Sequence, residues 1–211
     1  MKPVKVLHFI QFFSKRWLLW NIPVSGKKLY LTFDDGPVPE VTPKVLEILE
    51  KYKVKATFFC VGENVQKHPE LFQQLKEHGH SVGNHTFHHV KGWKTNTDEY
   101  LREVALCNMQ VNSVLFRPPH GQITPFQIQK VRKSGYKIVM WSILSCDFQQ
   151  EISPEQCIQN VLKNVKPGHI IVFHDSIKAQ KNMLPALDTC LKELLNQGYC
   201  FEIFKNQFFP R

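Results

Sequence analysis

The chain has 211 residues, of which 43% are hydrophobic, and it carries a formal net charge of +9. This length and composition are sufficient for one folded domain with a substantial core, and they exclude a low-complexity or disordered chain. A basic balance can favour an anionic polymer or a lipid surface, but more often it reflects only a solvated surface. The sequence contains no nucleic-acid-binding motif, so we expect no nucleic-acid partner.

Residues 1–26 form an aromatic and basic segment in front of a domain that spans residues 27–211. The apolar side chains of this segment fall on one helical stripe: Val6, Phe9, Ile10, Phe13, Trp17 and Trp20. The apolar run is too short to span a bilayer, and it lacks the small-residue cleavage site of a signal peptide. We predict a helix packed on the domain. A peripheral helix that contacts a membrane through residues 6–20 is the alternative.

After residue 26, apolar runs of strand length alternate with helical patterns. The predicted strands are Lys27 to Phe33, Lys55 to Val61, His80 to Asn84, Val114 to Phe116, Tyr136 to Ile143, His169 to Phe173 and Tyr199 to Phe204. This alternation predicts a parallel α/β architecture, in which residues that follow strands gather at one face of the sheet.

Punctuating residues mark where the intervening helices begin and end. Three pairs are typical of an N-cap followed by proline at the first helical position: Thr42-Pro43, Thr124-Pro125 and Ser153-Pro154. Gln156 would complete a capping box with Ser153. Gly79, Gly135 and Gly198 occur where helices are expected to stop.

Two adjacent carboxylates, Asp34 and Asp35, follow the first predicted strand. Consecutive strand residues point to opposite faces, so both could serve one site only where the strand breaks. Gly36-Pro37 supplies that break, since glycine allows unusual backbone angles and proline fixes the exit. The arrangement suggests metal-assisted hydrolysis. An ordinary acidic turn is the alternative.

His85 and His89 are four residues apart, a spacing that puts two imidazoles on one face of a helical turn. With Asp35 they would form a two-histidine, one-carboxylate metal site that leaves coordination positions open for water and substrate. Zn²⁺ suits these ligands best, although Co²⁺, Fe²⁺, Mn²⁺ or Ni²⁺ could occupy them. A solvated histidine-rich patch is the alternative, because the chain contains 10 histidines.

A rigid loop from Arg117 to Gly121 follows the predicted strand that ends at Phe116. Such a loop can hold an arginine against a carboxylate and present a backbone N–H to an oxyanion. A simple Pro-Gly turn is the alternative.

His174, at the end of another apolar run, is a candidate general acid because imidazole titrates near neutral pH. Asp147 could hydrogen-bond this histidine and raise its pKa. A core histidine and an unrelated loop aspartate would fit the same pattern.

Five segments, taken in order, resemble the polysaccharide deacetylase family, also called carbohydrate esterase family four, from about Lys27 to Phe204. They are the segments that contain Asp34 and Asp35, His85 to His89, Arg117 to Gly121, Asp147, and His174. The resemblance implies a single domain with a distorted (β/α)7 barrel. It implies Asp34 as general base, Asp35, His85 and His89 as ligands of one divalent metal, and His174 as general acid. It also implies that Arg117 orients Asp34, that Asp147 tunes His174, that the backbone N–H of His120 stabilises the oxyanion, and that Phe148, Val172 and Pro119 contact substrate.

The sequence departs from the family pattern at the rim of the expected cleft. His120 replaces the usual tyrosine and Phe148 the usual tryptophan, while Leu144 and Cys146 stand where many members have aspartate and arginine. None of these changes removes a group that the reaction needs, but they bear on the choice of substrate.

We therefore expect a metal-dependent hydrolase that removes acetyl groups from N-acetylated sugars, with an N-acetylglucosamine-type glycan, oligosaccharide or precursor as substrate. The alternatives are hydrolysis of a small amide or an O-acetyl ester on the same scaffold, and a non-catalytic carbohydrate-binding relative. Retention of base, acid and three ligands argues against the last. The oligomeric state stays open.

The six cysteines show no CxxC spacing and suggest free thiols in a reducing compartment. Since we recognise no export signal or transmembrane segment, we expect a cytoplasmic location, with peripheral membrane contact as the alternative.

Overall fold

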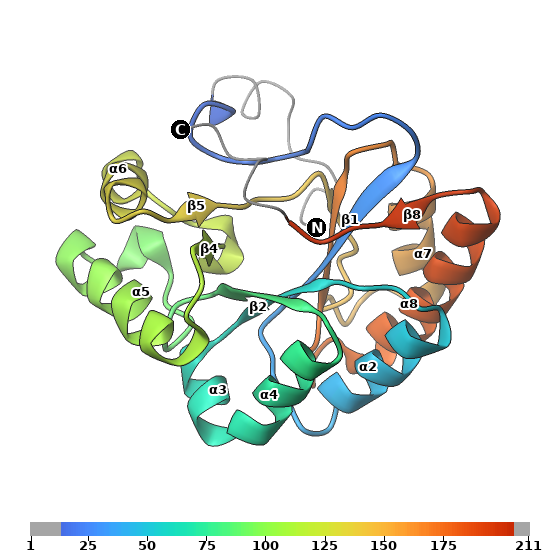
Figure 1. The fold of residues 1–211 in the computed structure, drawn as a ribbon, viewed down its shortest axis with the longest axis horizontal. Helices are drawn as coiled ribbons and strands as arrows, with labels where there is room; N and C mark the ends of the chain where they lie inside the picture. Colours follow the sequence, from blue (N-terminus) through green and yellow to red (C-terminus); the bar gives the residue numbers. More distant parts are fainter. Residues whose placement is uncertain (1–13, 205–211) are drawn as a thin grey trace.

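The apolar run that begins at Lys28 forms strand β1 (Lys28–Asp34), which is buried from Leu29 to its end. In the computed structural model, which describes residues 14–204, β1 lies in the middle of a curled parallel sheet (Figure 1). It pairs with β2 (Thr57–Cys60), with β7 (Ile170–His174) and, near its start, with β8 (Cys200–Phe201). Burial on both faces fits the apolar residues Leu29 to Leu31 and Phe33, and it also encloses the polar side chains of Thr32 and Asp34.

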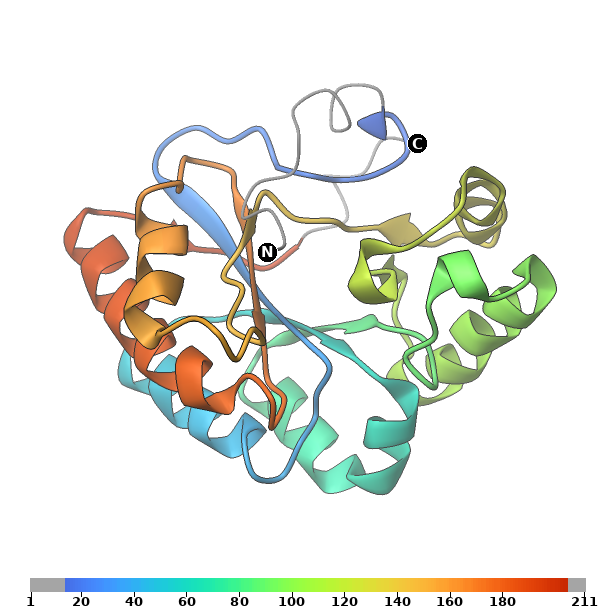
Figure 2. The ribbon, with the colours of Figure 1, turned by 180° about the vertical axis from the view of Figure 1, so that it is seen from behind.

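The remaining strands extend the sheet in the order β5–β4–β3–β2–β1–β7–β6. They are β3 (Ser81–Asn84), β4 (Leu115–Phe116), β5 (Lys137–Ile138) and β6 (Ile143–Leu144). The α-helices are α2 (Thr42–Lys51), α3 (Gly62–Lys67), α4 (Pro69–Glu77), α5 (Thr97–Val111), α6 (Pro125–Lys133), α7 (Pro154–Leu162) and α8 (Gln180–Asn196), and the short helices are η1 (Gly92–Lys94) and η2 (Pro119–Gly121). The helices surround the outer side of the sheet in both views (Figures 1 and 2), which confirms the predicted α/β class and distorted barrel.

The main hydrophobic core fills the space between the sheet and its helices. Phe33 and Phe58 stack there with ring centroids 4.9 Å apart, and Phe173 packs against Phe33 at 6.3 Å. Five of the six cysteines are buried and all six are free thiols, as expected. Most of the cysteines therefore act as small apolar side chains in this fold.

One predicted strand is wrong. The run from Tyr136 to Ile143 forms two short strands, β5 and β6, at opposite ends of the sheet, so the described part of the chain has eight strands rather than seven. The intervening residues 139–142 cross the opening of the barrel, and their N–H groups reach three parts of the chain: Val139 donates to Phe116, Met140 to Leu19 and Ser142 to Ile170. The crossing residues Val139 and Met140 are buried as strand residues would be, so the apolar pattern of the sequence continues from β5 to β6 and predicts a single strand.

The segment before β1 begins, where the structure describes it, with one helical turn, in which the N–H groups of Trp17 and Leu18 donate to the Ser14 carbonyl. From Leu19 onward it is extended, rather than helical as predicted through Trp20. Leu19 and Asn21 form single β-bridges with Val139 and His169. Alternate residues Leu18, Trp20 and Ile22 are buried, whereas Trp17 is 48% exposed. This segment helps to close the barrel, and its buried positions follow the period of a strand. In Figure 1 the blue segment runs from beside the residues that follow β5 to the start of β1.

Residues 6–13 of the predicted helical stripe lie outside the described residues, and membrane contact through residues 6–20 stays a prediction. Within residues 14–204, no helix combines the length and apolar character needed to cross a bilayer.

Helix ends follow the predicted signals with two exceptions. Thr124 caps α6 in a full capping box with Gln127, and Ser153 caps α7. The Gln156 side chain, expected to complete a box with Ser153, instead donates to Asn160. Gly79, Gly135 and Gly198 follow α4, α6 and α8 with positive φ, as helix stops do.

Thr42 is the first residue of α2 and not its N-cap, which is Val41. The Thr42 hydroxyl accepts a hydrogen bond from the Val38 N–H and donates one to the buried carboxyl of Asp175. A tertiary contact therefore uses the hydroxyl that the local pattern assigned to capping.

Candidate metal centre and active site

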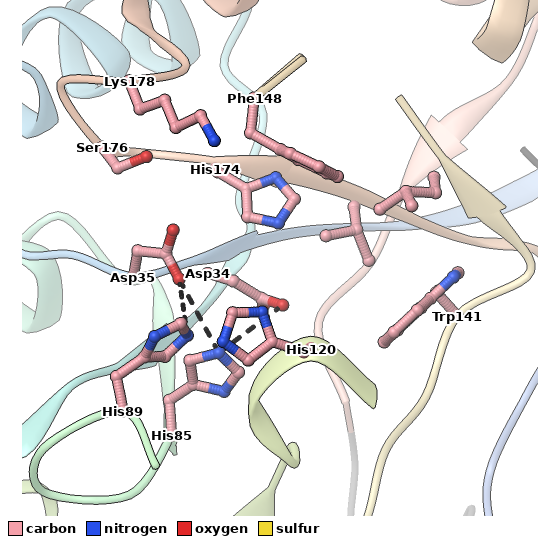
Figure 3. A pocket seen from close by; sticks show the side chains of 12 residues that line it. Asp34, Asp35, His85, His89, His120, Trp141, Phe148, His174, Ser176 and Lys178 are labelled. Carbon is pink, nitrogen blue, oxygen red and sulfur yellow. Dashed lines mark ion pairs between the residues drawn. The ribbon is translucent and has the colours of Figure 1, made fainter. Parts of the chain in front are cut away.

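A cavity of about 310 Å³ lies at the carboxyl ends of the strands (Figure 3). Its lining consists of Asp34, Asp35, His85, His89, His120, Trp141, Leu144, Phe148, Val172, His174, Ser176 and Lys178. In the sequence these residues belong to five separate segments. The fold thus brings most of the predicted site residues to one place, as expected for residues that follow parallel strands.

The turn after β1 directs both adjacent carboxylates into this cavity. Asp34 ends the strand, and Asp35 adopts a left-handed conformation with φ of 86°. This conformation is uncommon for a residue with a side chain, and it reverses the alternation that would separate the two carboxylates. The Gly36 N–H donates to Asp175 at 3.0 Å, and a Cβ on Gly36 would clash with that carboxyl group. Gly36 is therefore needed for close approach to Asp175.

The imidazoles of His85 and His89 converge on Asp35. The Asp35 Oδ1 atom lies 3.2 Å from His89 Nε2 and 3.8 Å from His85 Nε2. One ligand atom from each of the three residues can be chosen so that all lie within 4.8 Å of one another. Among the described residues, these are the only three His, Cys, Asp or Glu side chains that converge in this way. The set fits a divalent cation that prefers nitrogen and oxygen ligands.

The predicted helical turn between the two histidines is wrong. His85 follows β3 directly, and the residues from His85 to His89 form a loop in which Thr86 and His89 have φ of 62° and 55°. The Thr86 N–H donates to Asn84, and the Thr86 hydroxyl accepts from the Val90 N–H. These hydrogen bonds, and not those of a helix, hold the loop. The imidazoles of His85 and His89 come together as the spacing predicted, but through the loop conformation.

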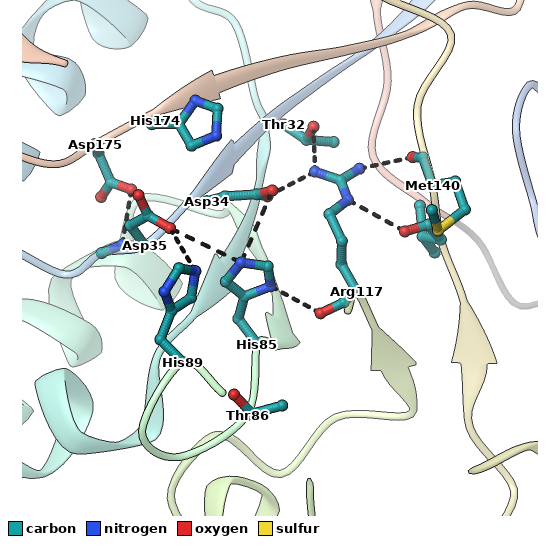
Figure 4. Close-up of polar contacts among 12 residues, drawn as sticks. Thr32, Asp34, Asp35, His85, Thr86, His89, Arg117, Met140, His174 and Asp175 are labelled. Atoms are coloured by element: carbon teal, nitrogen blue, oxygen red, sulfur yellow. Dashed lines mark hydrogen bonds and ion pairs between the residues drawn. The ribbon is translucent and has the colours of Figure 1, made fainter. Parts of the chain in front are cut away.

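Hydrogen bonding and burial prepare His85 to act as a neutral ligand. Its Nδ1 lies 2.7 Å from the Arg117 carbonyl oxygen, which can only accept, so Nδ1 carries the proton and Nε2 keeps its lone pair (Figure 4). Burial lowers the pKa of His85 to about 4. Burial opposes ionisation of Asp35, but the hydrogen bond from His89 and the nearby histidine charges keep the pKa of Asp35 well below its usual range. Neutral imidazole and ionised carboxylate are the states that a metal requires.

Asp34 is held by Arg117, whose side chain is fully buried. The guanidinium donates to Asp34 Oδ1 at 2.6 Å and to the Thr32 hydroxyl at 2.8 Å, and it also donates to the carbonyl groups of Val139 and Met140. Its remaining face packs 4.1 Å from the centroid of the Phe59 ring. The expected Arg117–Asp34 contact is present, and the other bonds of the guanidinium fix the position of the donor to Asp34 Oδ1.

His174 lies opposite Asp34 in the β1–β7 register. Its Nδ1 is 2.8 Å from Asp147 Oδ1, and its backbone N–H donates to the other carboxylate oxygen. Burial lowers the pKa of His174, but the charge of Asp147 and its hydrogen bond, aided by Asp35 and Asp34, outweigh burial and raise it to about 9. The expected Asp147–His174 contact is therefore present, and the imidazole is protonated at neutral pH.

Apolar and aromatic side chains, together with Ser176 and Lys178, form the rest of the wall. The Phe148 ring lies edge-on to His174 at 4.8 Å, and the His120 ring lies 4.6 Å from His89. Val172 is buried and lines the cavity, as the sequence predicted. Pro119 is buried at the start of η2 and does not line this cavity, so its predicted substrate contact is not seen. Pro119 directly precedes His120, which lines the cavity.

Sequence reasoning did not assign a role to four residues here: Trp141, Asp175, Ser176 and Lys178. Asp175 directly follows His174 at the end of an apolar run, a signal that could have found it. Ser176 and Lys178 lie in the turn before α8 and carry no pattern of their own. Trp141 belongs to the crossing segment, which the single-strand prediction concealed.

Comparisons with known proteins agree with this geometry. The family model described as polysaccharide deacetylase matches residues 21–139. A peptidoglycan-N-acetylglucosamine deacetylase of Bacillus cereus is 36% identical over 88% of this chain and 90% of that relative. A peptidoglycan-N-acetylmuramic acid deacetylase of Bacillus subtilis is 30% identical over 88% of this chain and 73% of its own length.

Solved structures give the same result for the fold. A crystal structure of a peptidoglycan N-acetylglucosamine deacetylase, determined in complex with a substituted benzamide, superposes with a TM-score of 0.86 and 32% identity, covering 95% of this chain and 96% of that one.

Proposed function

The chain belongs to the polysaccharide deacetylase family, and from this premise we propose that it hydrolyses the acetamide of N-acetylated sugars with the help of one divalent metal ion. The proposed substrates are N-acetylglucosamine-type glycans, oligosaccharides or their precursors. The names of the similar proteins support this class of substrate, since both of the relatives described above are deacetylases of N-acetylated sugars in peptidoglycan.

One observation carries the proposal. A single cavity contains the Asp35, His85 and His89 cluster, a carboxylate locked by arginine on one side, and a histidine paired with aspartate on the other. Amide hydrolysis needs an activated water, a means of holding charge on the carbonyl oxygen, and a proton for the departing amine. The cavity offers a separate group for each need.

Asp35, His85 and His89 would hold the metal, and Zn²⁺ suits this ligand set best. When bound, such an ion supplies Lewis acidity that lowers the pKa of water and polarises a carbonyl group. The protein contributes the geometry: the Arg117 carbonyl fixes the tautomer of His85, and the turn at Asp35 presents its carboxylate to both imidazoles.

Proton transfer is assigned to Asp34 and His174, which are register partners on β1 and β7 and both line the cavity. Asp34, with one oxygen bound to Arg117, would accept a proton from the attacking water through its other oxygen. His174, kept protonated by Asp147, would give a proton to the amine nitrogen as the carbon–nitrogen bond breaks. The products are acetate and the free amino sugar.

The remaining roles concern position. The backbone N–H of His120 would donate to the developing oxyanion, as a preorganised donor in a rigid loop can. Val172 and Leu144 are buried neighbours on the cavity wall and would contact the acetyl methyl group. Phe148 and Trp141 would offer aromatic faces to the sugar.

The decisive experiment is acetate release from N-acetylglucosamine oligomers by the purified chain, after chelation and after adding back single divalent metals. We expect activity to vanish on chelation and to return with Zn²⁺ or another ion that fits the three ligands. Binding of each metal is measured in parallel by titration calorimetry. Acetate release from acetylated xylan or small amides alone would favour the ester or amide alternative, and metal binding with no turnover on any substrate would favour a non-catalytic relative.

A further inference from the structure

A single lysine stands on the wall of the cavity beside the residue that would protonate the leaving nitrogen. Lys178 lines the cavity together with Ser176 and His174, and its ammonium group lies 6.0 Å from the centroid of the Phe148 ring. The same ring contacts His174 at 4.8 Å. Figure 3 shows Lys178 on the His174 side of the cavity, with its ammonium directed toward Phe148.

The backbone around this lysine is well fixed although its side chain is exposed. The Gln150 side chain donates to the Lys178 carbonyl at 2.7 Å, and the N–H groups of Ala179 and Gln180 both donate to the Ser176 carbonyl. These bonds hold the turn at the start of α8. The backbone from which the Lys178 side chain extends is therefore fixed at the rim of the cavity.

Acidic side chains do not neutralise Lys178. Within residues 14–204, none of the ion pairs includes it. The two carboxylates that line the cavity are already engaged, Asp34 by Arg117 and Asp35 by His89. The cation at the rim is thus available to a ligand.

Resting on the proposed function, we propose that Lys178 selects substrates that carry an anionic group on a carbon adjacent to the one bearing the acetamide. In a 2-acetamido sugar, the substituents nearest the nitrogen are those on C1 and C3. When that nitrogen faces His174, the substituent on one of these two carbons would be directed toward Lys178, which lines the cavity on the His174 side. A phosphate on C1 or a carboxylate ether on C3 would place negative charge within reach of the ammonium.

Two matched pairs of substrates test this preference by changing charge at one position. The first pair is the methyl glycoside of N-acetylmuramic acid and its methyl ester, which differ only in the charge near C3. The second pair is N-acetylglucosamine 1-phosphate and methyl N-acetylglucosaminide, which differ at C1. Acetate release by the metal-loaded full chain gives kcat/KM for each substrate at low ionic strength.

We expect the wild-type protein to favour the anionic member of at least one pair by about two- to fivefold, as for one solvent-exposed charge pair. The preference should fall as salt is added, because the interaction is screened. Lys178→Gln should bring the ratio close to one, and Lys178→Arg should retain it. Lys181→Gln, which removes an exposed lysine outside the cavity lining, is the matched control and should keep the wild-type ratio.

Equal turnover of both members of both pairs, or a preference that survives in Lys178→Gln, would overturn the inference while leaving the deacetylase proposal intact. Absence of acetate from all four substrates and from neutral oligomers, with metal bound, would overturn both. The pair whose ratio depends on Lys178 identifies the position of the recognised anion.

Discussion

At the scale of single residues, the site depends on giving chemically identical side chains different surroundings. Asp34 and Asp35 are adjacent in the chain, yet Asp34 contacts a buried arginine and Asp35 faces two imidazoles. The grouping of Asp35 with two imidazoles was predicted from the residues, whereas the contact of Asp34 with Arg117 was predicted from the resemblance to the family. The sequence could not predict the acceptors around Arg117, because the carbonyl groups of Val139 and Met140 approach it only through the crossing segment.

Substitutions of Asp34 and His85 should separate metal binding from turnover. Asp34→Asn preserves shape and the ligand cluster, so we expect normal metal affinity and a loss of roughly 10² to 10⁴ in kcat, as for a missing general base. His85→Ala removes a ligand and should lose both. Titration calorimetry and acetate release measure the two properties, and full activity in Asp34→Asn would refute the assignment of the base.

The pairing of Asp147 with His174 predicts a specific change in pH dependence. The pKa of His174 is raised to about 9, so the imidazole is protonated below that pH and loses its proton above it. The pair therefore adds stability and acid function that are complete below the ordinary histidine pKa, near 6.5, and are lost as the pH rises through about 9.

Asp147→Asn should move the alkaline limb of kcat/KM toward lower pH. If the pKa of His174 returns to its ordinary value, activity at pH 8 should fall roughly ten- to thirtyfold, with a much smaller loss at pH 6. The measurement is a pH–rate profile of both proteins between pH 5 and about 10. A uniform loss at all pH values, with an unmoved alkaline limb, would mean that Asp147 acts only on folding or position.

At the scale of elements, the pairing of β1 with β7 builds much of the site. The register sets Asp34 beside His174, and the residues just beyond both strands meet again where Asp175 accepts from the Gly36 N–H. The Thr42 hydroxyl at the start of α2 donates to the same carboxyl group. The buried side chain of Asp175 thus joins two strands, one turn and one helix. Burial raises the pKa of its carboxyl group to about 8.

Asp175→Ala should loosen the turn that presents Asp35. The change leaves two buried donors without their acceptor, so we expect a loss of about 1–3 kcal/mol in unfolding free energy and weaker metal binding. Asp188→Ala is a matched control. Asp188 lies on α8 and forms an exposed ion pair with Lys51, so its loss should lower the free energy of unfolding by less than about 1 kcal/mol. Thermal unfolding with and without metal measures both, and unchanged metal affinity in Asp175→Ala would show that the turn is held by other contacts.

At the scale of the whole molecule, the barrel is closed by chain segments that are not helices or regular strands. Residues 139–142 cross the opening, and the extended segment around Leu19 joins them through a β-bridge. Trp20 is buried in this closure, where its indole N–H donates to Ser14 and its carbonyl accepts from the Ser142 hydroxyl. The segment before β1 is therefore part of the fold. Its contact with a membrane and the cytoplasmic location of the protein stay predictions.

Two tryptophans in this segment provide a direct test. Trp20→Ala should lower the free energy of unfolding by about 3–5 kcal/mol, because it empties a buried site and removes an indole hydrogen bond. Trp17→Ala changes a side chain that is 48% exposed and should cost less than about 1 kcal/mol. Denaturant unfolding of both variants checks the difference, and equal stability would mean that the segment does not contribute to closure.

The periodicity of the sequence was sufficient to predict the α/β class and most strand positions, because both depend on local patterns. The candidate site residues were predicted from residue types at the ends of strands and from the family resemblance. Long-range folding sets how His85 and His89 converge, where β5 and β6 separate, and that Trp20 is buried while Trp17 is exposed. It also brings Lys178 beside His174 and Asp175 beside the turn at Asp35 and Gly36. Such contacts join residues far apart in the chain, and local patterns carry no signal for a partner that arrives through folding.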